Sequence, residues 1–304
     1  MFTIGIDIGG SKIAVGLLED DRIVCMERAG FAFFGDPKGL VDFLTGRINS
    51  LCGDFAVESA GVGTPGWVVG GVVSEAVNIG IDRLDLLSEL KCRVPVPVFV
   101  ENDARTALLG EAALGALAGC RNAMMVTLGT GIGGAFLLDG RLYRGSFGCA
   151  GEIGHVSFRE NGRPCCCGKR GCLELTASAS ALVRQARKLA SAGKGSDVLK
   201  GLCRGKRSEI DGETVFRAAK QGDRAVLAIL DRYTAELAHA LGEVAYLLDL
   251  EAIAVGGGIS VEEKHLTGPL GRKLMASGSK CRVVPAALGN NAGVIGAAML
   301  GKMG

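Results

Sequence analysis

Two passages of the chain repeat one pattern, and this repeat limits the folds that the chain can adopt. Each passage is an apolar strand, a glycine-rich turn and a second apolar strand, at residues 3–18 and again at 125–140. A recurrence about 120 residues apart predicts two structurally similar halves. Helical spacing at 104–117, 182–191, 224–248 and 292–300 alternates with strand-like runs at 94–100 and 252–255. Such alternation predicts an α/β chain.

The charge balance excludes several classes of partner. The chain has 304 residues with 34 basic and 32 acidic side chains, a formal net charge of +2. We therefore expect no nucleic-acid partner and no anionic membrane surface. Strand-like sequence begins at Thr3 with no leader pattern, and no apolar run is long enough to span a membrane. The expected compartment is the cytoplasm. Residues 192–212, rich in Gly, Ser, Lys and Arg, are expected to form an exposed loop.

The glycine turns are candidate phosphate sites. Glycines 129–134 lead into a strand, so they predict a β-hairpin and not a dinucleotide-binding turn, which needs a helix there. Such glycines allow positive φ and leave amides to face an anion. Asp7 ends a buried strand before Gly9-Gly10, where a carboxylate is costly unless it serves a Mg²⁺ shell or caps the turn. Glycines 256–258 end a strand and are expected to open a helix beside a nucleotide's base and ribose.

A cluster of cysteines predicts a metal site. Eleven cysteines occur, and four of them lie close together at 165, 166, 167 and 172. His155 with Cys165, Cys167 and Cys172 gives a tetrahedral donor set suited to structural Zn²⁺, with Cys166 as the spare. The alternative is a run of unpaired thiols near a core histidine. Two carboxylates flank this loop, Glu152 and Glu174, and both can accept hydrogen bonds from sugar hydroxyls.

Asn102 and Asp103 lie where a strand meets a helix. Either side chain is expected to be the N-cap of that helix. A second use is equally physical, because the carboxyl end of a strand in an open α/β sheet faces the ligand crevice. An aspartate there can accept the proton of an attacking hydroxyl during phosphoryl transfer.

These motifs together resemble the ROK family. The matching segments span nearly the whole chain in order, at 7–12, 61–66, 101–104, 128–134, 151–155, 165–174 and 256–258. The most specific feature is Glu-Ile-Gly-His combined with C-x-C-G-x-x-G-C-x-E. Three positions depart from the family pattern: Ser11 replaces the usual threonine, Cys166 is an uncommon insert, and Asn291 replaces a frequent aspartate. None removes a catalytic part.

The resemblance implies a fold and an activity. The fold is that of actin-like ATPases, two RNase-H-like α/β domains around a central cleft. We expect the first domain at 1–116 with a C-terminal helix at 290–304, and the second, with the zinc-binding loop, at 117–289. The implied activity is ATP-dependent phosphorylation of a hexose, above all at the 6-hydroxyl of glucose, with fructose, mannose, allose and N-acetylhexosamines as competitors. Mg²⁺ accompanies the ATP, and a homodimer is expected because dimers are common in the family.

The resemblance also assigns roles to residues. Asp103 is the catalytic base. The expected sugar contacts are Gly66, Asn78, Asn102, Asp103, Glu152, His155 and Glu174. The expected ATP and phosphate contacts are Asp7, Gly9, Gly10, Ser11, Lys12, Gly129, Thr130, Gly131, Gly133, Gly256, Gly257 and Gly258. The expected zinc ligands are His155, Cys165, Cys167 and Cys172.

Two rival functions come from other classes. The family includes sugar-sensing transcriptional regulators, which carry a winged helix-turn-helix ahead of the sugar domain. Here the first phosphate strand begins by Ile4, which leaves no room for that domain, and the charge is nearly neutral, so we do not expect a repressor. Asp103 and the phosphate turns favour a kinase over the remaining alternative, a sugar-sensing regulator lacking its DNA-binding domain. A polymer-forming actin-like ATPase would not need the Cys/His loop or the paired glutamates.

Overall fold

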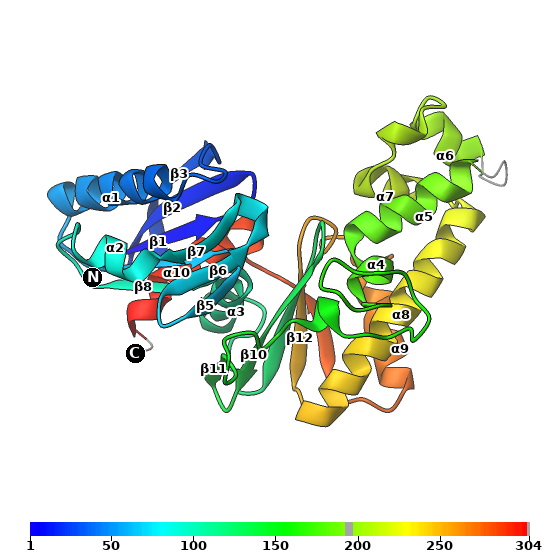
Figure 1. Cartoon of the computed structure of the whole chain (residues 1–304). Helices are drawn as coiled ribbons and strands as arrows, with labels where there is room; N and C mark the ends of the chain where they lie inside the picture. Colours follow the sequence, from blue (N-terminus) through cyan, green and yellow to red (C-terminus); the bar gives the residue numbers. More distant parts are fainter. Residues whose placement is uncertain (192–196, 303–304) are drawn as a thin grey trace. The chain divides into compact units, whose positions relative to one another are not determined.

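The chain divides into two compact units. A computed structural model describes residues 1–191 and 197–302. Unit 1 comprises Met1–Gly119, Ala135–Ala150 and Ala287–Gly304, and unit 2 comprises Cys120–Gly134 and Gly151–Ala286. Figure 1 labels helices and strands of both units, coloured from blue at the N-terminus to red at the C-terminus.

A mixed five-stranded sheet forms the centre of unit 1. Its order is β3-β2-β1-β4-β8, with β1–β2 and β2–β3 antiparallel and β1–β4 and β4–β8 parallel. The bounds are Phe2–Ile8 for β1, Lys12–Glu19 for β2, Arg22–Gly30 for β3, Val57–Thr64 for β4 and Val98–Asn102 for β8. The parallel strands β1, β4 and β8 end at the same edge, so residues that follow them gather there.

Helices cover both faces of this sheet. On one face Ile4, Ile6 and Ile8 pack with the buried side of α1 (Pro37–Asp54). On the other face the small-residue helix α10 (Ala292–Met299) lies against β1, β4 and α3 (Asp103–Leu114) (Figure 1, red). A Cβ at Gly5 would lie 1.9 Å from the carbonyl oxygen of Val294, so a glycine is required for this close approach. The packing holds α3, and with it Asp103, against the sheet.

A small antiparallel sheet interrupts the chain between β4 and β8, and we did not predict it. Its order is β5-β6-β7, with bounds Trp67–Val69, Val72–Ala76 and Ile81–Asp85. Gly66, which joins β4 to β5, has a φ of +92°, a conformation that favours glycine. A short turn, η1 (Val77–Ile79), and the helix α2 (Leu86–Lys91) complete this region.

The second five-stranded sheet repeats the strand order of the first. Its order is β11-β10-β9-β12-β13, and β9–β12 and β12–β13 are parallel. The bounds are Ala123–Leu128 for β9, Ile132–Leu138 for β10, Arg141–Tyr143 for β11, Ala252–Gly256 for β12 and Arg282–Pro285 for β13. A hairpin, β1-β2 or β9-β10, therefore begins each sheet, which confirms the predicted internal repeat and the α/β class.

The helices of unit 2 correct two expectations. Their bounds are Glu174–Ala177 for α4, Ala179–Ser191 for α5, Asp197–Leu202 for α6, Gly212–Lys220 for α7, Arg224–Leu248 for α8 and Thr267–Ala276 for α9. The expected loop at 192–212 is wrong at α6, where fully buried Leu199 anchors a helix; residues 192–196 lie outside the described part. Gly258 does not open a helix, because turns such as Ser260 N–H to Gly257 O precede α9.

Among the helices at residues 1–191 and 197–302, none combines the length and the apolar character that crossing a membrane would take.

Candidate active site

Asn102 and Asp103 form a hydrogen-bonded turn at the end of β8. The side-chain oxygen Oδ1 of Asn102 accepts from the backbone amides of Ala104 (3.0 Å) and Arg105 (3.3 Å), so Asn102 is the N-cap of α3. Its amide nitrogen donates to Gly66 O and to Asp103 Oδ1, both at 3.0 Å. Asp103 Oδ1 also accepts from Ala104 N at 2.8 Å. The Asp103 carboxylate is therefore fixed in orientation, at the sheet edge where β1 and β4 also end.

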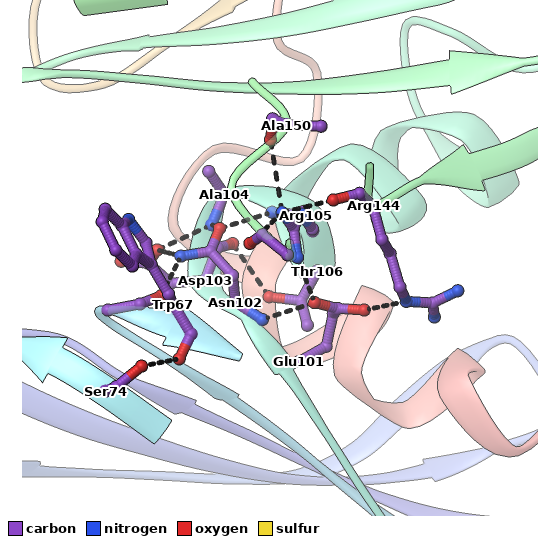
Figure 2. A network of polar contacts seen from close by, with 12 residues as sticks. Trp67, Ser74, Glu101, Asn102, Asp103, Ala104, Arg105, Thr106, Arg144 and Ala150 are labelled. Atoms are coloured by element: carbon purple, nitrogen blue, oxygen red, sulfur yellow. Dashed lines mark hydrogen bonds and ion pairs between the residues drawn. The ribbon is translucent and has the colours of Figure 1, made fainter. Parts of the chain in front are cut away.

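A buried ion-pair network lies directly beneath this turn (Figure 2). Arg105 Nη1 and Glu101 Oε1 are 3.0 Å apart, and each side chain is only 3% exposed. Arg144 Nε approaches Glu101 Oε2 at 2.5 Å from a half-exposed side chain. Glu101 Oε1 also accepts from the backbone amide of Asn102 at 2.9 Å. The carboxylate of Glu101 thus holds the backbone of Asn102, the N-cap residue.

Arg105 connects the same network to the segment after β11. Its Nη2 donates to the carbonyl oxygens of Gly148 (2.6 Å), Ala150 (3.3 Å) and Arg144 (3.4 Å). A buried guanidinium requires this number of partners, because an unpaired charge in the interior is very costly. Sequence reasoning missed Glu101, Arg105 and Arg144. The one signal was the i,i+4 spacing of Glu101 and Arg105, which allows a pair on a helix surface.

Asp7 and Asn78 both lie near the first glycine turn, at the end of β1. The strand register sets Asp7 opposite Gly63, and Asp7 lies against Gly293, where a Cβ would be 2.6 Å from its carboxyl carbon. Asn78, on η1, lies beside Gly10, whose Cβ would be 3.3 Å from Asn78 O. The end of β1 therefore gathers a buried carboxylate, a glycine turn and an amide side chain.

Asp7 is an acid whose burial opposes its charge. Burial raises its pKa from the ordinary 3.8 to about 6, and Lys12 partly offsets the shift. Because the pKa of Asp7 is raised on folding, protonation of this carboxyl favours the folded protein. This contribution to stability is fully present below pH 3.8 and is lost as the pH rises through 6. At neutral pH the charged carboxylate costs stability, which fits a group kept to bind a cation.

We expect Asp7→Asn to stabilise the protein at pH 8, in the absence of Mg²⁺ and nucleotide, by about 3 kcal/mol, from two pKa units at about 1.4 kcal/mol each. The gain should vanish below about pH 3, where the wild-type side chain is protonated in both the folded and the unfolded state. Urea unfolding at the two pH values measures both effects. A variant less stable than wild type at pH 8 would show instead that Asp7 caps its own turn.

The second glycine turn is held by Glu174. Glu174 is the first residue of α4, and its Oε2 accepts a hydrogen bond from the backbone amide of Ile132 at 3.0 Å. A Cβ at Gly131 would lie 2.1 Å from the same oxygen, so a side chain at this position would displace the Glu174 carboxylate from Ile132 N. Gly257, with a φ of +92°, approaches from the end of β12, and its Cβ would lie 2.2 Å from Leu128 O. The turn after β9 and the glycines after β12 therefore meet at one sheet edge.

The expectation about turn geometry is wrong in two respects. None of Gly9, Gly10, Gly129, Gly131 or Gly133 has a positive φ, so the left-handed region does not explain them. A Cβ would meet a close neighbour at Gly131, whereas at Gly129 it would meet nothing within 4 Å. The turn amides are also not all left for an anion. Ile132 N–H donates to Glu174, Gly129 N–H donates to Gly131 O, and Gly9 N–H donates to Lys12 O.

The Cys/His residues come together in a group that could hold a metal ion. Ligand atoms of His155, Cys165, Cys167 and Cys172 all lie within 4.8 Å of one another. His155 Nδ1 is 3.6 Å from Cys165 Sγ, and the sulfurs of Cys167 and Cys172 are 3.5 Å apart. Burial raises the pKa of Cys172 to about 12, so a thiolate there needs a cation beside it. Three thiols and an imidazole match zinc, whereas Mg²⁺ prefers oxygen donors.

The spare cysteine lies at the edge of this group. Cys166 is exposed, and its sulfur is 4.0 Å from that of Cys165. It also forms a second possible ligand group with Cys165 and Glu174. The two candidate groups share Cys165, so a variant of Cys166 can tell them apart.

The predicted sugar contacts are divided between the units. Gly66, Asn102 and Asp103 lie together in unit 1. Asn78 also belongs to unit 1, and unit 2 holds the remaining three: Glu152, His155 and Glu174. Glu152 is exposed and is the N-cap residue of η2 (Ile153–His155). A single pocket containing both groups stays a prediction.

Comparison with known proteins decides the family. The ROK family model matches residues 3–303, nearly the whole chain. The chain belongs to the ROK family. A glucokinase of Streptomyces coelicolor is 36% identical over 314 aligned residues, covering 99% of this chain and 97% of the relative. The fold is thus the α/β fold of actin-like ATPases, with two RNase-H-like domains.

Solved ROK structures include both kinases and regulators. The crystal structure of a ROK family glucokinase from Streptomyces griseus, in complex with glucose and AMPPNP, matches with a TM-score of 0.85, 35% identity and full coverage of both chains. A ROK family transcriptional regulator, a homologue of the E. coli MLC protein, matches with a TM-score of 0.87 and 25% identity, covering 99% of this chain and 78% of the regulator. The fold alone therefore does not separate the two functions.

Proposed function

We propose that the chain is an ATP-dependent hexose kinase that phosphorylates the 6-hydroxyl of glucose, with Asp103 as the general base. The observation that carries this proposal is the placement of Asp103 at the end of β8, where Asn102 and the Ala104 amide hold its Oδ1. A carboxylate fixed at a sheet edge can orient a hydroxyl and accept its proton. The glucokinase relatives, one of them solved with glucose and AMPPNP, support the same activity.

We propose the other roles for residues near the two sheet edges. We assign the metal and phosphates of Mg²⁺-ATP to Asp7, Gly9, Gly10, Ser11 and Lys12 in unit 1, and to glycines 129–133 and 256–258 with Thr130 in unit 2. Mg²⁺ supplies charge neutralisation at the phosphates when bound. The glucose hydroxyls fall to Gly66, Asn78 and Asn102 in unit 1 and to Glu152, His155 and Glu174 in unit 2. Closure of the two domains at 1–116 with 290–304 and at 117–289 would exclude water.

A panel of hexoses tests the proposed substrate. ADP release is measured with glucose, fructose, mannose, allose and N-acetylmannosamine, each at several concentrations. We expect the highest kcat/KM for glucose. A higher kcat/KM for N-acetylmannosamine would favour the activity named for the Haemophilus influenzae relatives, which are 27% identical. Sugar binding without ADP release on any member of the panel would favour a sugar-sensing regulator.

We further propose that the Cys/His group holds one structural zinc ion. Cys172→Ala is expected to remove the metal, because it deletes a buried ligand, and to weaken glucose binding through His155. Cys166→Ala is the matched control, because it removes an exposed thiol outside the ligand set, and it should keep one zinc per chain. Elemental analysis of the purified variants measures the metal content. Zinc loss in Cys166→Ala with retention in Cys172→Ala would contradict this ligand set.

A further inference from the structure

Trp67, the only tryptophan of the chain, lies at the candidate sugar site. It is the first residue of β5, directly after Gly66, whose carbonyl oxygen accepts the Asn102 amide at 3.0 Å. Figure 2 shows its indole at the same end of β8 as the Asn102 and Asp103 side chains. The residue is 38% exposed, although tryptophan is on average a highly buried residue type.

The alternation along β5 fixes the side to which the indole points. Val68 is buried in the core at 4% exposure, so its neighbours Trp67 and Val69 project from the opposite face. Val69 lies against Gly148, where a Cβ would be 2.3 Å from Val69 Cγ2. Gly148 is the residue whose carbonyl oxygen accepts Arg105 Nη2 at 2.6 Å. The Trp67 face of β5 is therefore the face that borders the Arg105 network and the Asp103 turn.

The backbone of Trp67 is held, so the ring has a defined position. Trp67 pairs with Ser74 on β6, and Gly66 before it is tied to Asn102. A ring presented in this way loses little conformational entropy when a ligand covers it. A ligand that covers the ring removes its apolar surface from water, which favours binding.

We propose that the indole of Trp67 is a stacking surface for the apolar C–H face of a hexopyranose, which makes Trp67 a binding and specificity residue. This inference rests on the proposed kinase function. A pyranose presents hydroxyls at its edge and C–H groups on its faces. Asn102, Asp103 and the unit 2 carboxylates can bind only the hydroxyls, whereas an aromatic face attracts the positively polarised C–H groups. A stacked ring discriminates against pyranoses with axial substituents on that face.

Intrinsic fluorescence reads this contact directly, because no other tryptophan contributes. Wild-type protein is titrated with glucose without ATP, and emission and acrylamide quenching are recorded beside calorimetry. We expect an emission change that saturates with the calorimetric Kd, and protection of the indole from acrylamide. Trp67→Ala should bind glucose about tenfold more weakly, about 1.4 kcal/mol, with KM raised and kcat nearly unchanged, because stacking is kept through the reaction. Trp67→Phe should restore most of the affinity.

Tyr246→Ala, at an 85% exposed aromatic on α8, is the control and should change neither constant. A Kd for Trp67→Ala within twofold of wild type overturns the inference while leaving the kinase function intact. If that variant does not fold, unchanged emission and quenching in glucose-saturated wild-type protein overturn it equally. Failure of every hexose to bind wild-type protein overturns the proposed function, and the stacking role with it.

Discussion

Asp103→Asn is expected to lower kcat for glucose phosphorylation by about 10²–10⁴-fold, the usual contribution of a general base. The asparagine keeps an oxygen for the Ala104 amide, which donates to Asp103 Oδ1 at 2.8 Å, and removes only the basic carboxylate. The turn geometry should therefore persist, and glucose affinity measured by calorimetry should stay within about threefold of wild type. Steady-state ADP release and calorimetry on one preparation separate the two effects.

Asp85→Asn is the matched control for this variant. Asp85 is also an aspartate at a helix N-terminus, where it caps α2 and accepts the Ser88 amide at 3.1 Å. It has no role in the proposed reaction, so the variant should retain kcat. A kcat for Asp103→Asn within tenfold of wild type would contradict the assignment of the base. Equal losses in both variants would point to helix capping as the cause.

The second large effect is on stability. Glu101→Gln is expected to lower the free energy of unfolding by about 3–5 kcal/mol, because it leaves the buried Arg105 guanidinium without its counter-charge. Arg105 is 2% exposed and cannot turn to solvent without releasing the carbonyl oxygens of Gly148 and Ala150. Urea unfolding measures the change.

Glu89→Gln gives a closely matched comparison. Glu89 and Arg93 form the same i,i+4 pair at 2.7 Å, but both side chains are more than a third exposed. Exposed pairs of this kind contribute about 0–1 kcal/mol. Glu101 is 3% exposed and also pairs with Arg144, whereas Arg93 keeps a second acidic partner, Asp42, when Glu89 is replaced. The loss in Glu89→Gln should therefore be much smaller. Similar losses of stability in both variants would show that the Glu101–Arg105 pair is not the buried anchor described above.

Features set by neighbouring residues could be predicted from the sequence. The helix at 224–248 has the bounds of α8, because its apolar spacing is long and uninterrupted. The two hairpins were predicted from strand, glycine turn and strand, and the grouping of His155 with the cysteines was predicted from their short spacing. In each case the residues that determine the structure lie within a few turns of one another along the chain.

Features set by distant residues could not be predicted in this way. Arg144 and the carbonyl oxygens that bind Arg105 are separated from it by many residues, so only the fold brings them together. The bond from Ile132 N–H to Glu174 is likewise tertiary, and it removed an amide that we expected to face an anion. Strands β5 to β7 are too short for a clear alternation of apolar and polar residues. The place of Trp67 at the candidate sugar site depends on the hydrogen bond between Asn102 and Gly66, which the sequence does not show.

The prediction of a loop at 192–212 from its charged composition was wrong for a different reason. A single buried leucine, Leu199, is enough to fix the short helix α6 among Lys and Gly residues that indicate a loop. The glycines at 256–258 misled because a strand followed by glycines commonly opens a helix in α/β proteins, whereas here turns intervene before Thr267.

The proposed reaction transfers the terminal phosphoryl group of ATP to a glucose hydroxyl. Phosphorus and carbon NMR of a reaction with Mg²⁺-ATP and ¹³C-labelled glucose tests it most directly. Glucose 6-phosphate and ADP are predicted in equal amounts, with little inorganic phosphate, because the proposed domain closure would keep water from the phosphoryl group. Inorganic phosphate without a phosphoester, or no turnover in zinc-loaded protein that binds glucose, would contradict it.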